Sequence, residues 1–228
     1  MRLEIHSRMR IGVAIPCFIK HISKCHELLE SINQQTRLPD QVVVSCSSSK
    51  PEDFFHRDYK FPLKIIITGA KQNTAQNRNA AAKLLDTDII TFMDADDLMH
   101  PQRLEIIEKA VEDGADIVLH SFFHGKECEQ PFPTISDYQI KPNIMDQCGN
   151  GCIKFKDFNT VSRIHHAQPS IKQWIFKKLQ FPEEPSYELT ADCVYCFRVF
   201  AIPDIQSAYI PLPMSKYNES LTCFAENQ

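Results

Sequence analysis

The sequence predicts an α/β fold: a doubly wound, mostly parallel sheet flanked by helices, in a single domain. Short apolar runs, which are typical of buried strands, alternate in the first half with stretches whose apolar residues recur at helical spacing. The chain of 228 residues is long enough to bury one sizeable core. Its 43% apolar and 24% charged residues are ordinary for a globular protein, so wholesale disorder is excluded.

Five strands and three helices are expected in the first half. The expected strands are Ile11–Ile15, Gln41–Ser45, which follows a Pro-Asp turn, Leu63–Thr68, Asp88–Met93 and Ala115–His120. The expected helices are His21–Gln35, which has an apolar stripe, the alanine-rich Thr74–Leu85, and one that begins at Pro101 and ends at Gly114. Proline suits the first position of a helix, and glycine suits the position just after its last turn.

The second half is less regular. Residues 125–160 contain proline, glycine and polar residues with weak periodicity. Helical patterns follow near Ser170–Lys178 and Glu188–Phe200, and the tail is expected to be irregular. We therefore expect one domain over residues 1–228 with two functional halves, about 9–121 and about 122–228.

Charged and polar residues follow three of the expected strands. In a doubly wound sheet, ligands bind beyond the carboxyl ends of the strands, which places Pro16–Lys20, Ser45–Ser49 and Asp94–Asp97 at the binding rim. Three carboxylates within the last range repel one another, and a divalent cation such as Mg²⁺ or Mn²⁺ would relieve that repulsion. The alternative is a solvated acidic turn in which Asp97 helps to cap the helix at Pro101.

Composition excludes several classes of protein. A net charge of −4 argues against a dedicated nucleic-acid binder. The six glycines form neither G-x-G-x-x-G nor G-x-x-x-x-G-K, so any nucleotide phosphates must be neutralised by other groups. No apolar run is long enough to span a membrane and no signal peptide is visible, which leaves peripheral membrane association open. Because nine cysteines cannot all pair, we expect a cytoplasmic protein with reduced thiols.

Four segments between residues 11 and 121 resemble, in order, the motifs of the GT-A glycosyltransferases of family 2. They are Ile15–Lys20 (the P-x-[YF]-N-[KR] opening), Leu28–Pro39 (a helix and turn), Gln76–Ala80 (A-R-N-x-[AG]) and Ile90–Asp97 (a strand followed by D-x-D). The resemblance implies a single GT-A domain that moves a sugar from a nucleotide-sugar donor to an acceptor hydroxyl, with inversion and with metal assistance. It assigns the donor to the first half and the acceptor (a glycan, a lipid-linked sugar or a protein) to the second.

The resemblance also implies the donor site. The implied nucleotide-sugar contacts are Pro16, Phe18, Ser45, Arg78 and Asp94, and the implied ligands of Mn²⁺ or Mg²⁺ are Asp94 and Asp96. Phe18 would pack on the nucleobase, and Arg78 would contact the base or the diphosphate. Ser45 and Cys46 stand where the family usually has an acidic pair that recognises uracil. The family makes a UDP-sugar the first expectation, but a serine hydroxyl accepts a hydrogen bond more weakly than a carboxylate, so guanosine or another base stays open.

Inverting transfer needs a general base for the acceptor hydroxyl. The family uses the Asp of a Glu-Asp pair that precedes a helix in the second half. Asp192 matches that Asp, although Ala191 stands in place of the Glu, and Glu188 is the alternative base. His165 and His166 precede this region and are candidates for acceptor or phosphate contacts.

Three other interpretations stay open. A sugar nucleotidyltransferase shares the expected sheet, but it usually has a glycine-rich loop after the first strand, which this sequence lacks. A zinc-stabilised binding module would use Cys148, Cys152, Cys193 and Cys196. A catalytically inactive relative of the family is the third, because Ile19, Ser45 and Ala191 depart from the family pattern.

Overall fold

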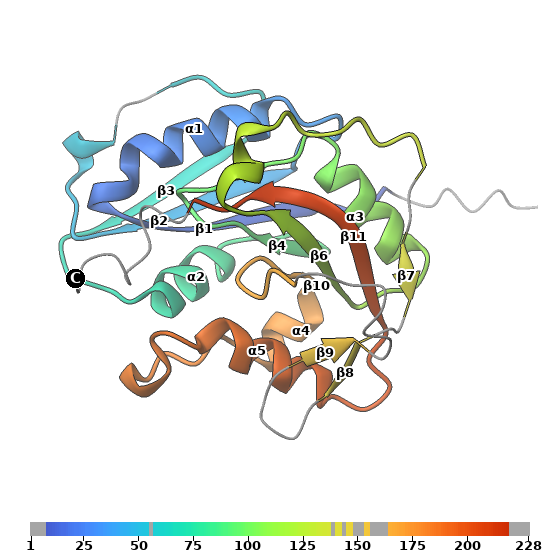
Figure 1. Cartoon of the computed structure of the whole chain (residues 1–228). Helices are drawn as coiled ribbons and strands as arrows, with labels where there is room; N and C mark the ends of the chain where they lie inside the picture. The colour runs from blue at the N-terminus through green and yellow to red at the C-terminus, as the bar shows by residue number, and fades with distance from the viewer. Residues whose placement is uncertain are drawn as a thin grey trace, which may run out of the picture.

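The fold is built on one mixed β-sheet with helices on both faces (Figure 1). The structure is a computed structural model that describes residues 8–54, 57–137, 140–142, 145–147, 153–155 and 164–218, with the backbone alone for 145–147 and 153–155. Within these residues, nine strands pair in the order β3-β2-β1-β4-β10-β6-β11-β5 with β7 against β11, and β8 and β9 pair separately. The strands are β1 (Ile11–Phe18), β2 (Gln41–Ser47), β3 (Leu63–Thr68), β4 (Ile89–Phe92), β5 (Leu98–Met99), β6 (Ile117–Phe123), β7 (Lys141–Pro142), β8 (Met145–Gln147), β9 (Ile153–Phe155), β10 (Ser170–Lys172) and β11 (Ser207–Lys216).

Five α-helices cover the two faces of the sheet. Helices α1 (Ile22–Asn33) and α3 (Arg103–Glu112) pack on one face, and α2 (Thr74–Ala82), α4 (Gln173–Lys178) and α5 (Ala191–Phe200) pack on the other. Each face buries its own cluster of apolar side chains, as expected for a sheet whose strands are buried on both sides. The predicted α/β architecture, a sheet flanked by helices, is confirmed, and the sheet is mixed because β5, β7 and β10 pair antiparallel with their neighbours. Short 3-10 turns lie at Ile19–His21, Pro51–Asp53, Gly125–Glu129 and Pro185–Tyr187.

The strands of the first half have the expected direction. β1 runs parallel to both β2 and β4, and β2 runs parallel to β3. Parallel strands end at the same edge of a sheet, so the residues that follow β1, β2 and β4 meet at one rim. Helix α3 ends as predicted, because Gly114 follows it with a φ of +109°, a conformation that favours glycine. The helix itself begins at Arg103, two residues after Pro101.

The helix expected over Ser170–Lys178 is wrong in its first three residues. They form β10, which lies antiparallel between β4 and β6, and only Gln173–Lys178 is helical. The hydroxyls of Ser170 and Thr91 are 2.7 Å apart across the β10–β4 pair. Pairing with two strands far away in the sequence outweighs the helical spacing of this short segment.

The tail expected to be irregular contains the longest strand that the structure describes. β11 spans ten residues, runs parallel to β6 and pairs antiparallel with β5 and β7. Pro211 and Pro213 obscure the strand pattern in the sequence, because proline cannot donate to a sheet ladder. The register of β11 against β6 shifts on either side of Pro213, and those irregularities accommodate the prolines.

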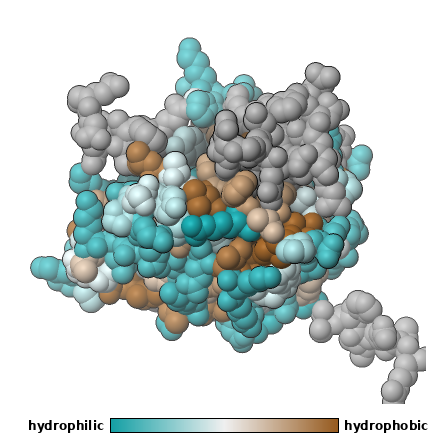
Figure 2. Space-filling model, turned by 90° about the horizontal axis from the view of Figure 1, so that it is seen from below, coloured by the Kyte–Doolittle hydropathy of each residue, from teal (hydrophilic) through white to brown (hydrophobic). Residues whose placement is uncertain are grey.

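One face of the molecule is mostly polar. Figure 2, which views the molecule from below the orientation of Figure 1, shows hydrophilic residues interrupted by small hydrophobic patches. Among the described residues, the large apolar side chains with the most exposed surface are Ile19, Leu84, Trp174 and Leu189. Within the described ranges, none of the helices combines the length and apolar character that a membrane crossing requires.

Candidate active site

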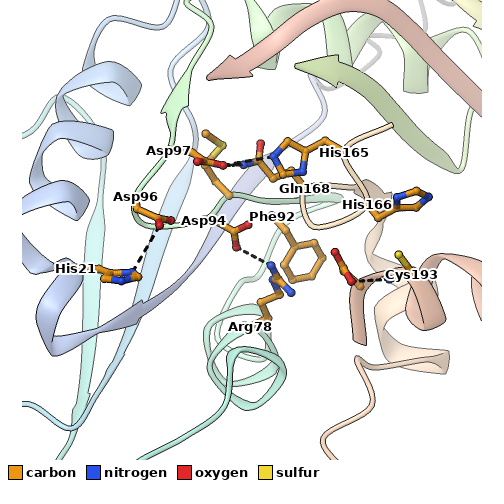
Figure 3. A network of polar contacts seen from close by, with 12 residues as sticks. His21, Arg78, Phe92, Asp94, Asp96, Asp97, His165, His166, Gln168 and Cys193 are labelled. Carbon is orange, nitrogen blue, oxygen red and sulfur yellow. Dashed lines mark hydrogen bonds and ion pairs between the residues drawn. The ribbon is translucent and has the colours of Figure 1, made fainter. Parts of the chain in front are cut away.

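The candidate site lies at the carboxyl ends of β1, β2 and β4, where the loop after β4 carries Asp94, Asp96 and Asp97 (Figure 3). The three side chains point in different directions. Asp94 faces Arg78 from α2, Asp96 faces His21 at the start of α1, and Asp97 faces Gln168 and His165. The loop therefore sits between the two helical layers of the fold.

Arg78 and Asp94 form a buried ion pair. The guanidinium Nη2 lies 2.6 Å from Asp94 Oδ1, with only 6% and 18% of the two side chains exposed. Burial by itself would lower the pKa of Arg78, but the negative charges of Asp94 and Asp192 raise it above the ordinary arginine value. The guanidinium also lies 5.3 Å from the ring centroid of Phe181, a cation–π contact. Arg78 thus stays protonated, and its guanidinium is held against the loop after β4.

The asparagines on either side of Arg78 hold α2 in place. The Asn77 side chain accepts a hydrogen bond from Ser45 Oγ at 3.0 Å and donates one to Ser47 Oγ at 2.9 Å. The Asn79 side chain donates to the Phe181 carbonyl at 2.9 Å and accepts from the Phe181 backbone N–H at 3.0 Å. Ser45, a predicted nucleotide contact, is fully buried, and its hydroxyl is engaged by Asn77.

Asp96 lies in a partly buried, acidic environment. Burial, together with the charges of Asp94 and Asp97, raises the pKa of Asp96 to about 7. Its Oδ2 is 3.9 Å from His21 Nδ1. Asp96 also lines a cavity of about 240 Å³, whose walls are Lys24, Glu27, Asp96, Leu98, Gly125, Cys128, Lys216, Tyr217 and Asn218. The cavity lies between α1 and the end of β11.

The other two predicted donor residues lie along β1. Pro16 is buried and pairs in register with Ser45 of β2. Phe18 is half-buried at the end of β1, and its ring meets the edge of His21 at 6.4 Å between ring centroids. Phe18 is therefore near the His21–Asp96 side of the loop, and Pro16 is part of the sheet below it.

Asp97 turns away from the rim and does not cap α3. The residue before the helix is Gln102, whose backbone N–H donates to His100 Nδ1. Asp97 is 1% exposed; it accepts hydrogen bonds from Gln168 Nε2 at 2.5 Å and from the Asn218 backbone N–H at 2.8 Å. Burial, with a further contribution from Asp94, raises its pKa well above the ordinary aspartate value. The suggested capping role of Asp97 is thus wrong.

Asp192 lies in the first turn of α5. Its side chain is half-buried, and Oδ1 accepts a hydrogen bond from the Cys193 backbone N–H at 2.8 Å. Its charge is one of the causes that raise the pKa of Arg78, so the two groups are electrostatically coupled. The alternative base, Glu188, is exposed at the end of the 3-10 turn Pro185–Tyr187.

His165 and His166 occupy different environments. His165 is buried, its Nε2 is 3.4 Å from Asp97 Oδ2, and burial lowers its pKa to about 4. His166 is half-buried, and its pKa is lowered by burial although the charge of Asp192 opposes the shift. Both rings are therefore neutral near pH 7. His165 faces the buried side of the aspartate loop, whereas His166 lies on the α5 side (Figure 3).

Sequence reasoning missed four polar residues at this site: His21, Asn77, Asn79 and Gln168. The two asparagines could have been noticed, because they flank Arg78 within the segment that resembles a family motif. Gln168 stands alone in the sequence, and only the return of β10 beside β4 brings it to the aspartate loop.

The structure describes part of the cysteine set proposed for zinc. Cys148 and Cys152 lie outside the described residues, and Cys193 and Cys196 both lie on α5. The buried Cys196 thiol donates to the His166 carbonyl at 3.5 Å. Across the described part of the chain, no group of three or more His, Cys, Asp or Glu side chains is arranged to hold a metal ion unaided.

Comparison with known proteins agrees with this architecture. The family model described as glycosyl transferase family 2 matches residues 13–178, more than half of the chain. The chain belongs to glycosyl transferase family 2. An uncharacterised glycosyltransferase of Haemophilus influenzae is 25% identical over 201 residues, which are 82% of this chain and 67% of the relative. The uncharacterised glycosyltransferase YwdF of Bacillus subtilis is 28% identical over 105 residues, 46% of this chain and 39% of the relative.

Solved structures share the fold of this family 2 member. The crystal structure of residues 1–349 of S. aureus TarS matches with a TM-score of 0.65 at 16% identity, over 93% of this chain and 61% of that chain. The same TarS fragment in complex with UDP-GlcNAc matches with a TM-score of 0.64 at 15% identity, and it too is covered over only 61% of its length. The likeness shows the GT-A fold, and this chain spans about three fifths of the TarS fragment that it matches.

Proposed function

We propose that this family 2 member transfers a sugar from a nucleoside-diphosphate sugar, most simply a UDP-sugar, to an acceptor hydroxyl with inversion at the anomeric carbon. The observation that carries the proposal is the Arg78–Asp94 ion pair at the rim, electrostatically coupled to Asp192 at the start of α5. A fixed cation suits a leaving diphosphate, and a carboxylate in a neighbouring element suits proton removal. One site thereby contains both functions that the reaction needs.

The donor class rests on the family and on the fold. TarS has been solved with UDP and with UDP-GlcNAc, and its fold matches this chain over more than nine-tenths of the chain's length. The guanidinium of Arg78 would bind the diphosphate, and Phe18 would pack on the base. Because Ser45 is buried and bonded to Asn77, recognition of the base would fall to other groups on the rim.

A divalent cation fits the aspartate loop. Oxygen ligands suit Mg²⁺ and Mn²⁺, and the pKa of Asp96 is raised by its burial and then by the negative charges of Asp94 and Asp97, which a cation would offset. Such cations are often held by one or two carboxylates together with substrate phosphates and water, so the lack of a larger ligand cluster within the described ranges agrees with this arrangement. Asp96 and Asp94 would hold the cation, which would supply charge stabilisation to the departing diphosphate.

The chemical step would divide between Arg78 and Asp192. The acceptor hydroxyl attacks the anomeric carbon from the face opposite the diphosphate, and Asp192 takes its proton. The bond from the anomeric carbon to the diphosphate oxygen breaks, and the diphosphate leaves with the electron pair while Arg78 stabilises its charge. The acceptor would be a glycan, a lipid-linked sugar or a protein bound by the second half of the chain. We place the reaction in the cytoplasm, where the free thiols of the six described cysteines would stay reduced.

A ligand-binding panel tests the class of reaction. Thermal unfolding would be followed with UDP, GDP and their sugar conjugates, each with and without Mn²⁺. A stabilisation that requires both a nucleotide and Mn²⁺ is expected, and it identifies the base. A parallel incubation with a nucleoside triphosphate and a sugar phosphate, with release of pyrophosphate, would instead establish a nucleotidyltransferase. A lack of response to every nucleotide would contradict the proposal and favour an inactive relative.

Two variants test the assignment of the base. Asp192→Asn should retain Mn²⁺-dependent binding of UDP while transfer falls by about 10²–10⁴-fold, the usual contribution of a general base. Glu188→Gln is the matched control, because this exposed carboxylate lies one turn before α5. The assignment fails if Glu188→Gln abolishes transfer while Asp192→Asn does not, or if Asp192→Asn removes UDP binding.

A further inference from the structure

A buried polar network lies behind the aspartate loop. Gln168 is 0% exposed, and its Nε2 donates to Asp97 Oδ2 at 2.5 Å. Its Oε1 accepts from Arg103 Nη1 at 2.8 Å, and its backbone carbonyl accepts from Arg103 Nη2 at 3.0 Å. Arg103 is fully buried as well, and its Nη2 also donates to the Phe92 carbonyl at 3.1 Å. The network thus joins α3, β4 and the segment that leads into β10.

The direction of each hydrogen bond in this network is fixed by chemistry. A guanidinium only donates, so the Gln168 side chain must present its oxygen to Arg103 and its NH₂ group to the aspartate loop. Asp97 must then accept there, and its second oxygen must accept from the backbone N–H of Asn218. If the Gln168 amide turned over, its NH₂ group would face the donors of Arg103. An asparagine amide at position 97 would likewise set its NH₂ group against a neighbouring N–H donor. The hydrogen bonds that run from Arg103 through Gln168 and Asp97 to Asn218 can therefore all form in only one arrangement of donors and acceptors.

The network also reaches the cavity beside Asp96. Asn218 follows β11 and lines that cavity together with Lys216 and Tyr217. Its backbone N–H bond to Asp97 ties this wall to the residue next to Asp96. The aspartate loop, the segment before β10 and the end of β11 are thus joined at the single buried carboxylate of Asp97.

We propose that Gln168 and Asp97 are positioning residues for the donor site: they fix Asp96 and the neighbouring cavity wall relative to Arg78. The inference rests on the proposed function, because it concerns how the aspartate loop is set for a cation and a diphosphate. Neither side chain faces the rim, so neither touches the donor. The two residues act by holding Asp96 in position. A shift of the Asp96 carboxylate therefore changes the Mn²⁺ concentration that UDP binding requires.

A reciprocal exchange separates positioning from charge. Asp97→Asn sets an NH₂ group against the Gln168 amide, and Gln168→Glu sets a carboxylate against Asp97. Each single variant should raise the Mn²⁺ concentration for half-maximal UDP binding by about 10- to 100-fold, the usual effect of residues that orient metal ligands. In the double variant, the new amide at position 97 donates to the new carboxylate at position 168, and that carboxylate also accepts from Arg103. The double variant should therefore recover most of the lost stability and of the lost Mn²⁺ response.

A second buried glutamine provides the control. Gln35 is 6% exposed, donates to the His100 carbonyl at 2.7 Å and accepts from the Leu104 backbone N–H at 3.1 Å, and neither bond involves an aspartate of the loop. Gln35→Glu should lower stability without changing the Mn²⁺ response, whereas the Gln168 variant should change both. Equal effects of the two substitutions on the Mn²⁺ response would overturn the positioning role.

The remaining outcomes are also decisive. A double variant that folds stably but stays as impaired as the single variants would show that the charge at position 97 matters rather than positioning, which contradicts the proposal. If one single variant fails to fold, the other single variant and the double variant still give the comparison. If the wild-type chain binds no UDP with Mn²⁺, the proposed function fails. If it binds normally and the single variants match it, only the positioning proposal fails.

Discussion

The Arg78–Asp94 pair is expected to stabilise the fold as well as to bind the donor, and the two contributions can be separated. Arg78→Met removes the cation and leaves the Asp94 carboxylate, 18% exposed, beside Asp96 and Asp97 without its partner at 2.6 Å. Removing one member of a buried pair usually costs about 3–5 kcal/mol in the free energy of unfolding. We expect a loss in this range, measured by urea denaturation. Asp94→Asn in the Arg78→Met background should restore part of it, because the unpaired charge is then gone.

Binding should respond differently from stability. The double variant Arg78→Met, Asp94→Asn should unfold at a urea concentration closer to that of the wild type. It should nevertheless bind UDP at least as weakly as Arg78→Met does, because the guanidinium for the diphosphate is still missing and Asp94 no longer offers a carboxylate to the divalent cation. The exposed pair Lys109–Asp113, with 3.2 Å between Nζ and Oδ1, is the control, and Lys109→Met should cost less than about 1 kcal/mol. A loss for Arg78→Met as small as that of the control would refute the buried-pair argument.

Two further variants test how the site is supported. Gly12→Ala would place a Cβ 2.8 Å from both Leu85 Cδ2 and Thr87 Oγ1, so urea denaturation should show a loss of about 1–3 kcal/mol; an unchanged midpoint would mean that this contact relaxes freely. Asn79→Leu leaves the Phe181 backbone N–H without its acceptor at 3.0 Å, which should cost about 1–3 kcal/mol. Because Asn79 holds the segment that precedes α5 and Asp192, transfer by Asn79→Leu should fall more than UDP binding does. Equal losses would mean that Asn79 supports the donor side alone.

The sequence predicts the first half of the fold well and the second half poorly, for a physical reason. β1 to β4 are short apolar runs, and the apolar stripe of α1 and the alanine-rich α2 lie between them, so local pattern and tertiary structure agree. β10 is three residues long and β11 contains two prolines, so their local patterns do not indicate strands. Both exist because distant strands accept them as partners, and a single sequence does not encode such pairing in any local signal.

The same distinction applies to the site. Arg78, Asp94 and Asp96 could be predicted because they lie within short motifs at the ends of strands or in the adjoining helix. The partners of Asp97 could not, because Gln168 and Asn218 come from 71 and 121 residues further along the chain. Such contacts depend on the insertion of β10 and on the position of β11 in the sheet.

Helix α2 explains how the two halves of the chain form one site. Asn77 and Asn79 are two residues apart, so they point to different sides of the helix, Asn77 to β2 and Asn79 to the segment before α5. Arg78, between them, points to Asp94 on the loop after β4. In the proposed reaction, a buried arginine between two anchored neighbours would offer a diphosphate a fixed cation, which a chain with few glycines needs in place of a glycine-rich loop. A change that loosens either asparagine should therefore affect both halves of the site.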